Sequence, residues 1–252
     1  MTTTRDGGRT AGQGDGDGCD NGNGNGGSGR DRPRPLRIVL ADDERMVRTA
    51  LRAILGAEDD MEVVGEAATG AAAVPLIREL RPDIVLMDVR MPEIDGIRAT
   101  EQVLAGMAEP PRIIVVTTFE NDAYVYDALR AGASGFLLKR SGAEDLVQAV
   151  RLVARSDSLL FPAAVRGLAA RHAGERASQD AVRTLRARLS ERERAVLRQM
   201  TAGLTNAEIA ERLGVGPATV KTHVAGVLAK LGVRDRTQAV IAAYECGFVR
   251  PG

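Results

Sequence analysis

Three aspartates occupy positions where carboxylates can act together. Asp42 and Asp43 follow the apolar run LRIVLA at residues 36–41, and Asp88 closes the run DIVLMD at residues 83–88. Such runs are typical of buried strands in a parallel sheet, whose carboxyl ends share one edge. Clustered carboxylates repel one another, and a hard divalent cation with oxygen ligands relieves that repulsion. We therefore expect a Mg²⁺ site at this edge.

A hydroxyl and a cation end two further apolar runs. Thr117 closes RIIVVT at residues 112–117, and Lys139 closes GFLLK at residues 135–139. This set of groups suits phosphoryl transfer. An aspartate would be the nucleophile, a metal would draw charge from the phosphoryl oxygens, and the lysine and threonine would hold the remaining phosphoryl oxygens. A flavin site is disfavoured, because the loop ADDERMVR is acidic where a phosphate cradle needs Gly, Ser or Thr.

The elements that position these residues alternate regularly. Continuously apolar strands that alternate with helices predict a doubly wound α/β domain with five parallel strands in the flavodoxin-like order 2-1-3-4-5. Pro75 removes a backbone donor inside the second helical stretch, so we expect that helix to be kinked or short. The expected strand and helix ranges are 36–41 and 44–56, 61–67 and 69–80, 83–88 and 95–107, 112–117 and 122–132, and 135–139 and 142–155.

Composition divides the chain further. Of its 252 residues, residues 1–35 hold 11 of the 28 glycines and almost no apolar side chains, so they are predicted to be a disordered Gly/Asp/Asn-rich tail. Residues 36–155 form the α/β domain, and residues 156–186 are expected to be a partly helical connector. Residues 187–252 complete the chain as a small all-α domain of four short helices.

The four-helix prediction depends on helix start signals. The segments that begin at Ser190 and Thr205 both fit the S/T-x-x-E capping box. A glycine break at residues 214–216 precedes Pro217, which is tolerated at a first helical position, and a periodic helix then runs to about Leu231. We expect a tight glycine-containing turn to join the second and third of these helices.

Charge points to nucleic acid as a partner of this last domain. The net formal charge of zero hides 14 basic and 20 acidic residues in 36–155 against 15 basic and 9 acidic residues in 156–252. The start of the helix from Pro217 can enter a major groove, where Lys221 reaches a phosphate or a guanine edge and Thr222 touches a thymine methyl or a phosphate. Thr219 lies beside them. His223 either faces a backbone phosphate or fills a packing position, and the sequence favours neither.

Other classes of protein are disfavoured. Cys19 and Cys246, the only cysteines, are too few for a disulfide framework or a thiolate zinc site. No apolar run approaches the roughly 20 residues of a membrane span, and the amino terminus lacks the apolar stretch of a signal peptide. We expect a cytoplasmic protein without a membrane partner.

Two groups of motifs resemble a known family. Residues 36–155 resemble the receiver domain of bacterial two-component response regulators. The motifs that carry this resemblance are VLADDERMVR, IVLMDVRMPEIDG, VVTTF and AGASGFLLK. The motif LSERERAVLRQMTAGLTNAEIAERLGVGPATVKTHVAGVLAKLGVRDRTQAV resembles the LuxR-type helix-turn-helix of the NarL/FixJ class over about residues 187–250.

The resemblance implies a role for each residue of the acidic rim. Asp88 would accept a phosphoryl group from a sensor histidine kinase. Asp43, with Asp42, Asp88 and the backbone carbonyl of Arg90, would organise Mg²⁺. The resemblance further implies that Lys139 pairs with the acyl phosphate, that Thr117 follows the phosphoryl group inward, and that Phe136 is the switch aromatic.

These features predict a DNA-binding transcriptional regulator of a two-component system. Phosphorylation of Asp88 would free the DNA-binding domain and promote binding of a homodimer to double-stranded promoter DNA, with RNA polymerase as a further partner. We expect no enzyme activity beyond self phosphoryl transfer and autodephosphorylation. A phosphorylation-independent regulator is one alternative. An aspartyl-phosphate hydrolase is another, but its D-x-D motif is missing, since Val89 and Arg90 follow Asp88.

Overall fold

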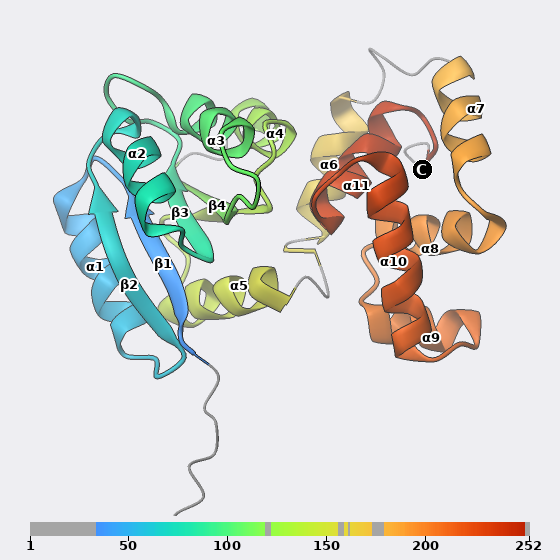
Figure 1. Cartoon of the computed structure of the whole chain (residues 1–252), viewed down its shortest axis with the longest axis horizontal. Coiled ribbons are helices and arrows are strands. Elements are labelled where there is room, and N and C mark those ends of the chain that lie inside the picture. The colour runs from blue at the N-terminus through green and yellow to red at the C-terminus, as the bar shows by residue number, and fades with distance from the viewer. Residues whose placement is uncertain (1–33, 119–121, 156–158, 161, 173–178, 250–252) are drawn as a thin grey trace, which may run out of the picture. The chain divides into compact units, whose positions relative to one another are not determined.

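The computed structural model describes residues 34–118, 122–155, 159–160, 162–172 and 179–249 (Figure 1). They contain five strands and eleven helices. Except for Arg34 and Pro35, the tail expected over residues 1–35 lies outside these ranges. Within the same ranges, no helix is long and apolar enough to cross a membrane.

The five strands form one parallel sheet, as the alternating pattern predicted. Their order is β2-β1-β3-β4-β5, which confirms the flavodoxin-like topology. This order makes β1 and β3 neighbours, so the residues that follow them lie at one edge of the sheet. The strands are β1 (Leu36–Ala41), β2 (Met61–Ala67), β3 (Ile84–Asp88), β4 (Arg112–Thr117) and β5 (Gly135–Leu138).

Helices cover both faces of the sheet because successive strand residues point to opposite sides. Ile38 and Leu40 share a core with the helices α1 (Arg45–Gly56) and α5 (Ala143–Arg155). Val39 and Ala41 face the other core. The helices of that side are α2 (Gly70–Leu80), α3 (Gly96–Ala105) and α4 (Asp122–Arg130).

Helix α2 decides between the two outcomes expected at Pro75 only in part, because the structure shows its length. It is not short, since it passes through Pro75 and continues to Leu80. Ala73, Val74 and Ile77 of this helix are buried in the core, and that packing holds the helix across the missing backbone donor.

The C-terminal part is entirely helical. Helices α6 (Pro162–His172) and α7 (Gln179–Arg188) lie in the region expected to be a partly helical connector. Both predicted capping boxes are present, at Ser190 and Thr205. The four helices that follow Leu189, as predicted, are α8 (Glu191–Thr201), α9 (Asn206–Leu213), α10 (Pro217–Leu231) and α11 (Arg236–Glu245).

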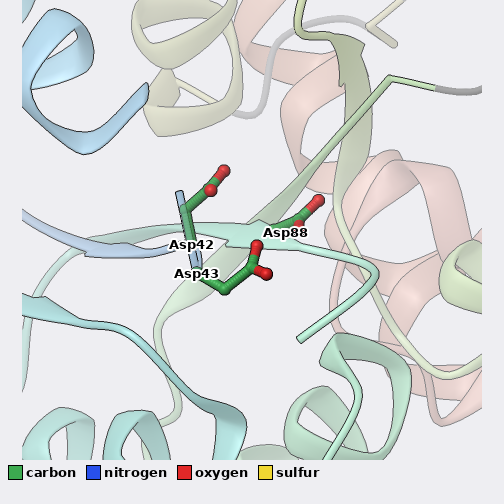
Figure 2. Close-up of side chains that lie close together, drawn as sticks. All are labelled: Asp42, Asp43 and Asp88. Atoms are coloured by element: carbon green, nitrogen blue, oxygen red, sulfur yellow. The ribbon is translucent and has the colours of Figure 1, made fainter. Parts of the chain in front are cut away.

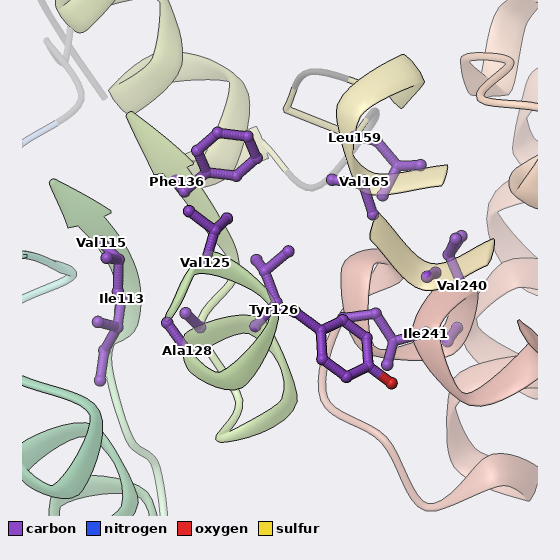
Figure 3. Packing of buried hydrophobic residues seen from close by; sticks show 14 of the residues in the cluster. Ile113, Val115, Val125, Tyr126, Ala128, Phe136, Leu159, Val165, Val240 and Ile241 are labelled. Carbon is purple, nitrogen blue, oxygen red and sulfur yellow. The ribbon is translucent and has the colours of Figure 1, made fainter. Parts of the chain in front are cut away.

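One apolar cluster continues from the α/β region into the helical region (Figure 3). Val125 and Tyr126 of α4 belong to it, as do Val165 of α6 and Val240 and Ile241 of α11. Helix α11 therefore packs against α4 and α6 on one side, while it also contacts α8 and α10.

Candidate functional site

The three predicted aspartates come together at the carboxyl edge of the sheet (Figure 2). Ala41 of β1 pairs with Met87 of β3, so the residues that follow these two are neighbours across the edge. One carboxylate oxygen from each of Asp42, Asp43 and Asp88 lies within 4.8 Å of the others. Asp42 and Asp88 are buried, whereas Asp43 is exposed.

Burial changes the proton affinity of Asp88. The cost of desolvating its carboxylate, together with the charges of Asp42 and Asp43, raises the pKa of Asp88 to about 6, although the nearby Lys139 opposes the rise. Three carboxylates held this close are electrostatically unfavourable unless a cation joins them.

The donor set fits a hard divalent cation. Three carboxylates at one rim offer the oxygen ligands that Mg²⁺ takes. Among the described residues, the buried Oδ2 of Asp42 accepts no hydrogen bond, and Lys139 Nζ lies 2.8 Å from it as an ion-pair partner. A buried carboxylate oxygen without a hydrogen bond is costly, and a bound cation would remove that cost.

Lys139 enters the same site from the end of β5. Its Nζ lies 2.8 Å from Asp42 Oδ2, 3.0 Å from Glu44 Oε1 and 3.6 Å from Asp88 Oδ1. Burial alone would lower the pKa of Lys139, but its close contacts with the Asp42 and Glu44 carboxylates hold the pKa above its ordinary value. The sequence reasoning missed Glu44, which follows the Asp42-Asp43 pair directly.

The rim encloses a small pocket of about 270 Å³. Thr117 is buried at the end of β4, where its carbonyl accepts a hydrogen bond from the Lys139 amide at 2.8 Å. Phe136 is buried in β5 and belongs to the apolar core. The residues that line the pocket are Asp43, Glu44, Asp88, Arg90, Thr117, Thr118 and Lys139.

The predicted DNA-contacting residues lie at the start of α10. Thr219, Lys221 and Thr222 are exposed, and His223 is half-buried. The Thr222 hydroxyl donates to the carbonyl of Ala218 at 3.1 Å, which leaves its methyl group and oxygen lone pairs for a partner. The opposite side of the helix packs into the core through Val220, Val224 and Val227.

An ion pair positions α10 against α8. Glu193, the acidic member of the Ser190 capping box, contacts Lys230 Nζ through Oε2 at 2.6 Å. The ion pair with Lys230 lowers the pKa of Glu193. A Cβ atom at Gly226 would lie 2.7 Å from Glu193 Oε1, so the glycine makes room for this carboxylate.

Two families match successive parts of the chain. The family described as "Response regulator receiver domain" matches residues 38–151. The family described as "Bacterial regulatory proteins, luxR family" matches residues 187–243.

Several known proteins are similar to this chain. Transcriptional regulatory protein LiaR of Bacillus subtilis is 40% identical over 211 residues, which cover 83% of this chain and 97% of that protein. Response regulator protein VraR of Staphylococcus aureus is 36% identical over 215 residues, which cover 85% of this chain and 99% of that protein. A solved two-component response regulator of the LuxR family, from Aurantimonas sp. SI85-9A1, is 34% identical with a TM-score of 0.50 and covers 54% of this chain and 96% of its own.

Proposed function

Because the chain belongs to the response regulators of two-component systems, with a receiver domain followed by a LuxR-type DNA-binding domain, we propose that Asp88 is its phosphoryl acceptor. The observation that carries this proposal is the convergence of three carboxylates and a lysine on one small pocket. Transcriptional response regulators of this class have a histidine kinase and DNA as partners. Here the kinase would phosphorylate Asp88 and so control binding to double-stranded promoter DNA.

The proposed transfer is an attack by one carboxylate oxygen of Asp88 on phosphorus. The N–P bond of the kinase's phosphohistidine breaks as an O–P bond to Asp88 forms, and the released imidazole takes a proton from solvent. With a pKa of about 6, Asp88 is mostly ionised at neutral pH and is a competent nucleophile. Receiver domains typically bind Mg²⁺ at such an acidic pocket, where it would offset charge on the phosphoryl oxygens.

The residues around Asp88 divide the remaining tasks. Asp42, Asp43 and the backbone carbonyl of Arg90 would hold Mg²⁺ together with Asp88. Lys139, whose ammonium already lies 3.6 Å from Asp88, would pair with the acyl phosphate. We assign the switch to Thr117, which would follow the phosphoryl group inward, and to Phe136.

The DNA contacts are proposed for the first turns of α10. The exposed Lys221 would bind a phosphate or a guanine edge, and Thr219 and Thr222 would contact phosphate or a thymine methyl. For His223 we favour a contact with the DNA backbone at the edge of the interface, because its side chain is half-buried beside the exposed pair. We further propose that the chain is cytoplasmic and binds paired half-sites as a homodimer. RNA polymerase would be a further partner.

Response-regulator transcription factors are not enzymes in the ordinary sense. We propose that the chemistry of this chain is limited to its own phosphorylation and autodephosphorylation, without turnover of an external phosphoester.

Phosphorylation can be tested on the purified full-length chain. Incubation with acetyl phosphate and Mg²⁺ should add one phosphoryl group by intact mass. Asp88→Asn should abolish the addition, whereas Asp59→Asn, which changes an exposed aspartate of the same domain, should not. A parent chain that stays unmodified, or a labelled Asp88→Asn variant, would refute the assignment and favour a phosphorylation-independent regulator.

A further inference from the structure

A cavity of about 700 Å³ lies at the edge of the sheet opposite the aspartate rim. Leu36, Ile84 and Arg112, which line it, are the first residues of β1, β3 and β4, whereas Asp88 is the last residue of β3. The cavity is more than twice as large as the pocket of about 270 Å³ beside Asp88. Its volume falls within the roughly 300–1,000 Å³ usual for small-molecule sites, so a ligand larger than a phosphoryl group would fit.

Hydrogen bonds hold the walls of this cavity in place. The loop between α2 and β3 is fixed on both sides, because the Asp83 amide donates to the Arg37 carbonyl at 2.8 Å and the Arg112 amide donates to the Asp83 carbonyl at 3.0 Å. The Asp83 carboxylate accepts two hydrogen bonds from the Arg34 guanidinium, at 2.8 and 2.9 Å, and a third from the Arg37 amide. Arg34 therefore neutralises the acidic side chain of this loop.

Three further arginines give the cavity an excess of positive charge. Arg78 belongs to the last turn of α2, Arg81 follows that helix as its C-cap, and Arg112 begins β4. The other carboxylate in the lining is that of Glu109. With Asp83 already neutralised by Arg34, the three arginines outweigh Glu109, and the cavity favours an anion.

Most N–H groups of these three guanidinium groups remain available to a ligand. A guanidinium has five N–H donors, and it often holds phosphate through two of them at once. Arg78 donates through Nη2 to the Gln102 carbonyl at 3.0 Å, and Arg112 donates through Nη1 to the Val153 carbonyl at 2.7 Å. Within the described part of the chain, the exposed Arg81 side chain makes no hydrogen bond or ion pair.

Two backbone features favour guanidinium groups at this cavity. Arg81 has a φ of 45°, in the left-handed region that glycine usually occupies at a helix C-terminus because a Cβ atom is strained there. At the end of α3, a Cβ atom on Gly106 would lie 2.9 Å from Arg78 Cζ and 3.0 Å from Arg78 Nε. An arginine thus stands where glycine would be less strained, and a glycine leaves room for the guanidinium of Arg78.

Apolar side chains form much of the remaining lining. Pro82 and Pro111 are buried, and Leu36, Met107 and Pro110 are half-buried. Apolar surface adds to affinity only when a ligand has a body that covers it. Inorganic phosphate would leave this part of the cavity unused.

We propose that the cavity binds an organic polyphosphate of nucleotide size. Its phosphates would lie on Arg78, Arg81 and Arg112, and its body would cover the apolar side chains. The site is separate from the acidic rim, whose carboxylates repel a free anion. The proposal does not depend on phosphorylation of Asp88.

Calorimetric titration of the purified full-length chain with ATP tests the proposal. EDTA and about 150 mM NaCl in the buffer remove cations from the acidic rim and screen long-range attraction. We expect a single ATP to bind each chain. Adenosine, which lacks phosphates, and inorganic tripolyphosphate, which lacks a body, should each bind at least about tenfold more weakly. The absence of ATP binding, or tripolyphosphate binding as tight as that of ATP, would overturn the proposal.

Two variants test the arginines. Arg81→Gly removes one guanidinium and suits the left-handed backbone, so we expect it to stay folded and to bind ATP at least about tenfold more weakly. Gly106→Ala adds the Cβ atom that displaces Arg78 and should weaken binding at least about threefold. Arg98→Ala removes the same charge from an exposed position of α3 and is the matched control. Circular dichroism and the thermal unfolding midpoint establish that each variant is folded, and parental affinity in Arg81→Gly would overturn the proposal.

Hydrogen–deuterium exchange locates the bound ATP. We expect ATP to slow amide exchange in peptides that cover residues 78–84 and 106–112 of the parent, but not in Arg81→Gly at the same ATP concentration. The start of α10 carries the exposed Lys221, where ATP would instead imitate DNA phosphates. Protection confined to residues 217–223, together with loss of binding in Lys221→Ala, would place ATP on the DNA surface and overturn the proposal.

Discussion

The ammonium of Lys139 lies 2.8 Å from Asp42 and farther, at 3.6 Å, from Asp88. Before a phosphoryl group arrives, the lysine is thus held mainly by Asp42 and by Glu44 on the exposed side. Pairing with an acyl phosphate on Asp88 requires the lysine to leave these partners.

Glu44→Gln should ease that movement. Removal of the Glu44 charge weakens one hold on Lys139 and makes the pocket less repulsive to an incoming anion. Because the Glu44 side chain is 57% exposed, we expect only a modest effect, a rise of roughly 1.5- to 5-fold in the initial rate of phosphorylation by acetyl phosphate. Glu62→Gln, at an exposed position of β2, is the control. Equal rates in the parent and Glu44→Gln would show that Glu44 does not restrain the lysine.

Magnesium should stabilise the chain through the acidic rim. A cation that binds only the folded state adds about 2.7 kcal/mol to the free energy of unfolding when its concentration is 100 times its dissociation constant. We therefore expect Mg²⁺ to raise the thermal unfolding midpoint by several degrees compared with NaCl of equal ionic strength. Asp43→Asn should lose most of this rise, because Asp43 belongs to the proposed metal site and is exposed, so that its substitution should leave the fold intact. A full rise in Asp43→Asn would remove Asp43 from the metal site.

DNA affinity should depend on salt and on Lys221. Most protein–DNA affinity comes from release of counterions by phosphate contacts, so binding should weaken steeply as salt increases. If Lys221 contacts a phosphate, Lys221→Ala should reduce the slope of log affinity against log salt by about 1. Arg98→Ala, which removes an exposed charge of the receiver domain, should leave the slope unchanged. An unchanged slope in Lys221→Ala would place this residue outside the interface.

Gly226→Ala should destabilise the DNA-binding domain despite the higher helix propensity of alanine. The new methyl group would meet Glu193 Oε1 at 2.7 Å, and Glu193 is held by Lys230 and by the Ser190 amide. We expect a loss of about 1–3 kcal/mol, as for other overpacked sites.

Gly167→Ala in α6 is the matched control for this substitution. Its Cβ atom would approach only Arg171, at 3.7 Å, so we expect a gain of up to about 1 kcal/mol. The free energy of unfolding in urea measures both variants. A gain in both would show that Glu193 yields readily to the new methyl group.

Much of the α/β fold was accessible from the sequence because its signals are local. Apolar runs fix the buried strands, and the topology rule for parallel sheets brings Asp42 beside Asp88. Glu44 was missed because its role depends on where Lys139 arrives from β5, which is a tertiary relationship.

The hydrogen bond between Ser134 and Asp235 was not predictable for the same reason. Ser134 and Asp235 are separated by 101 residues, and nothing in their local sequence indicates that they pair. Gly226 is likewise unfavourable in a helix by propensity alone, and the position of Glu193 explains its presence.

The central claim is that phosphorylation of Asp88 controls DNA binding. The most direct measurement uses a duplex selected from a random 30-base-pair library by the phosphorylated chain. Its affinity for the full-length chain is measured by fluorescence anisotropy, with and without acetyl phosphate and Mg²⁺. The account predicts that treatment tightens binding by the parent by at least about fivefold and leaves Asp88→Asn unchanged. Equal affinity of the treated and untreated parent, or an equal gain in Asp88→Asn, would contradict it.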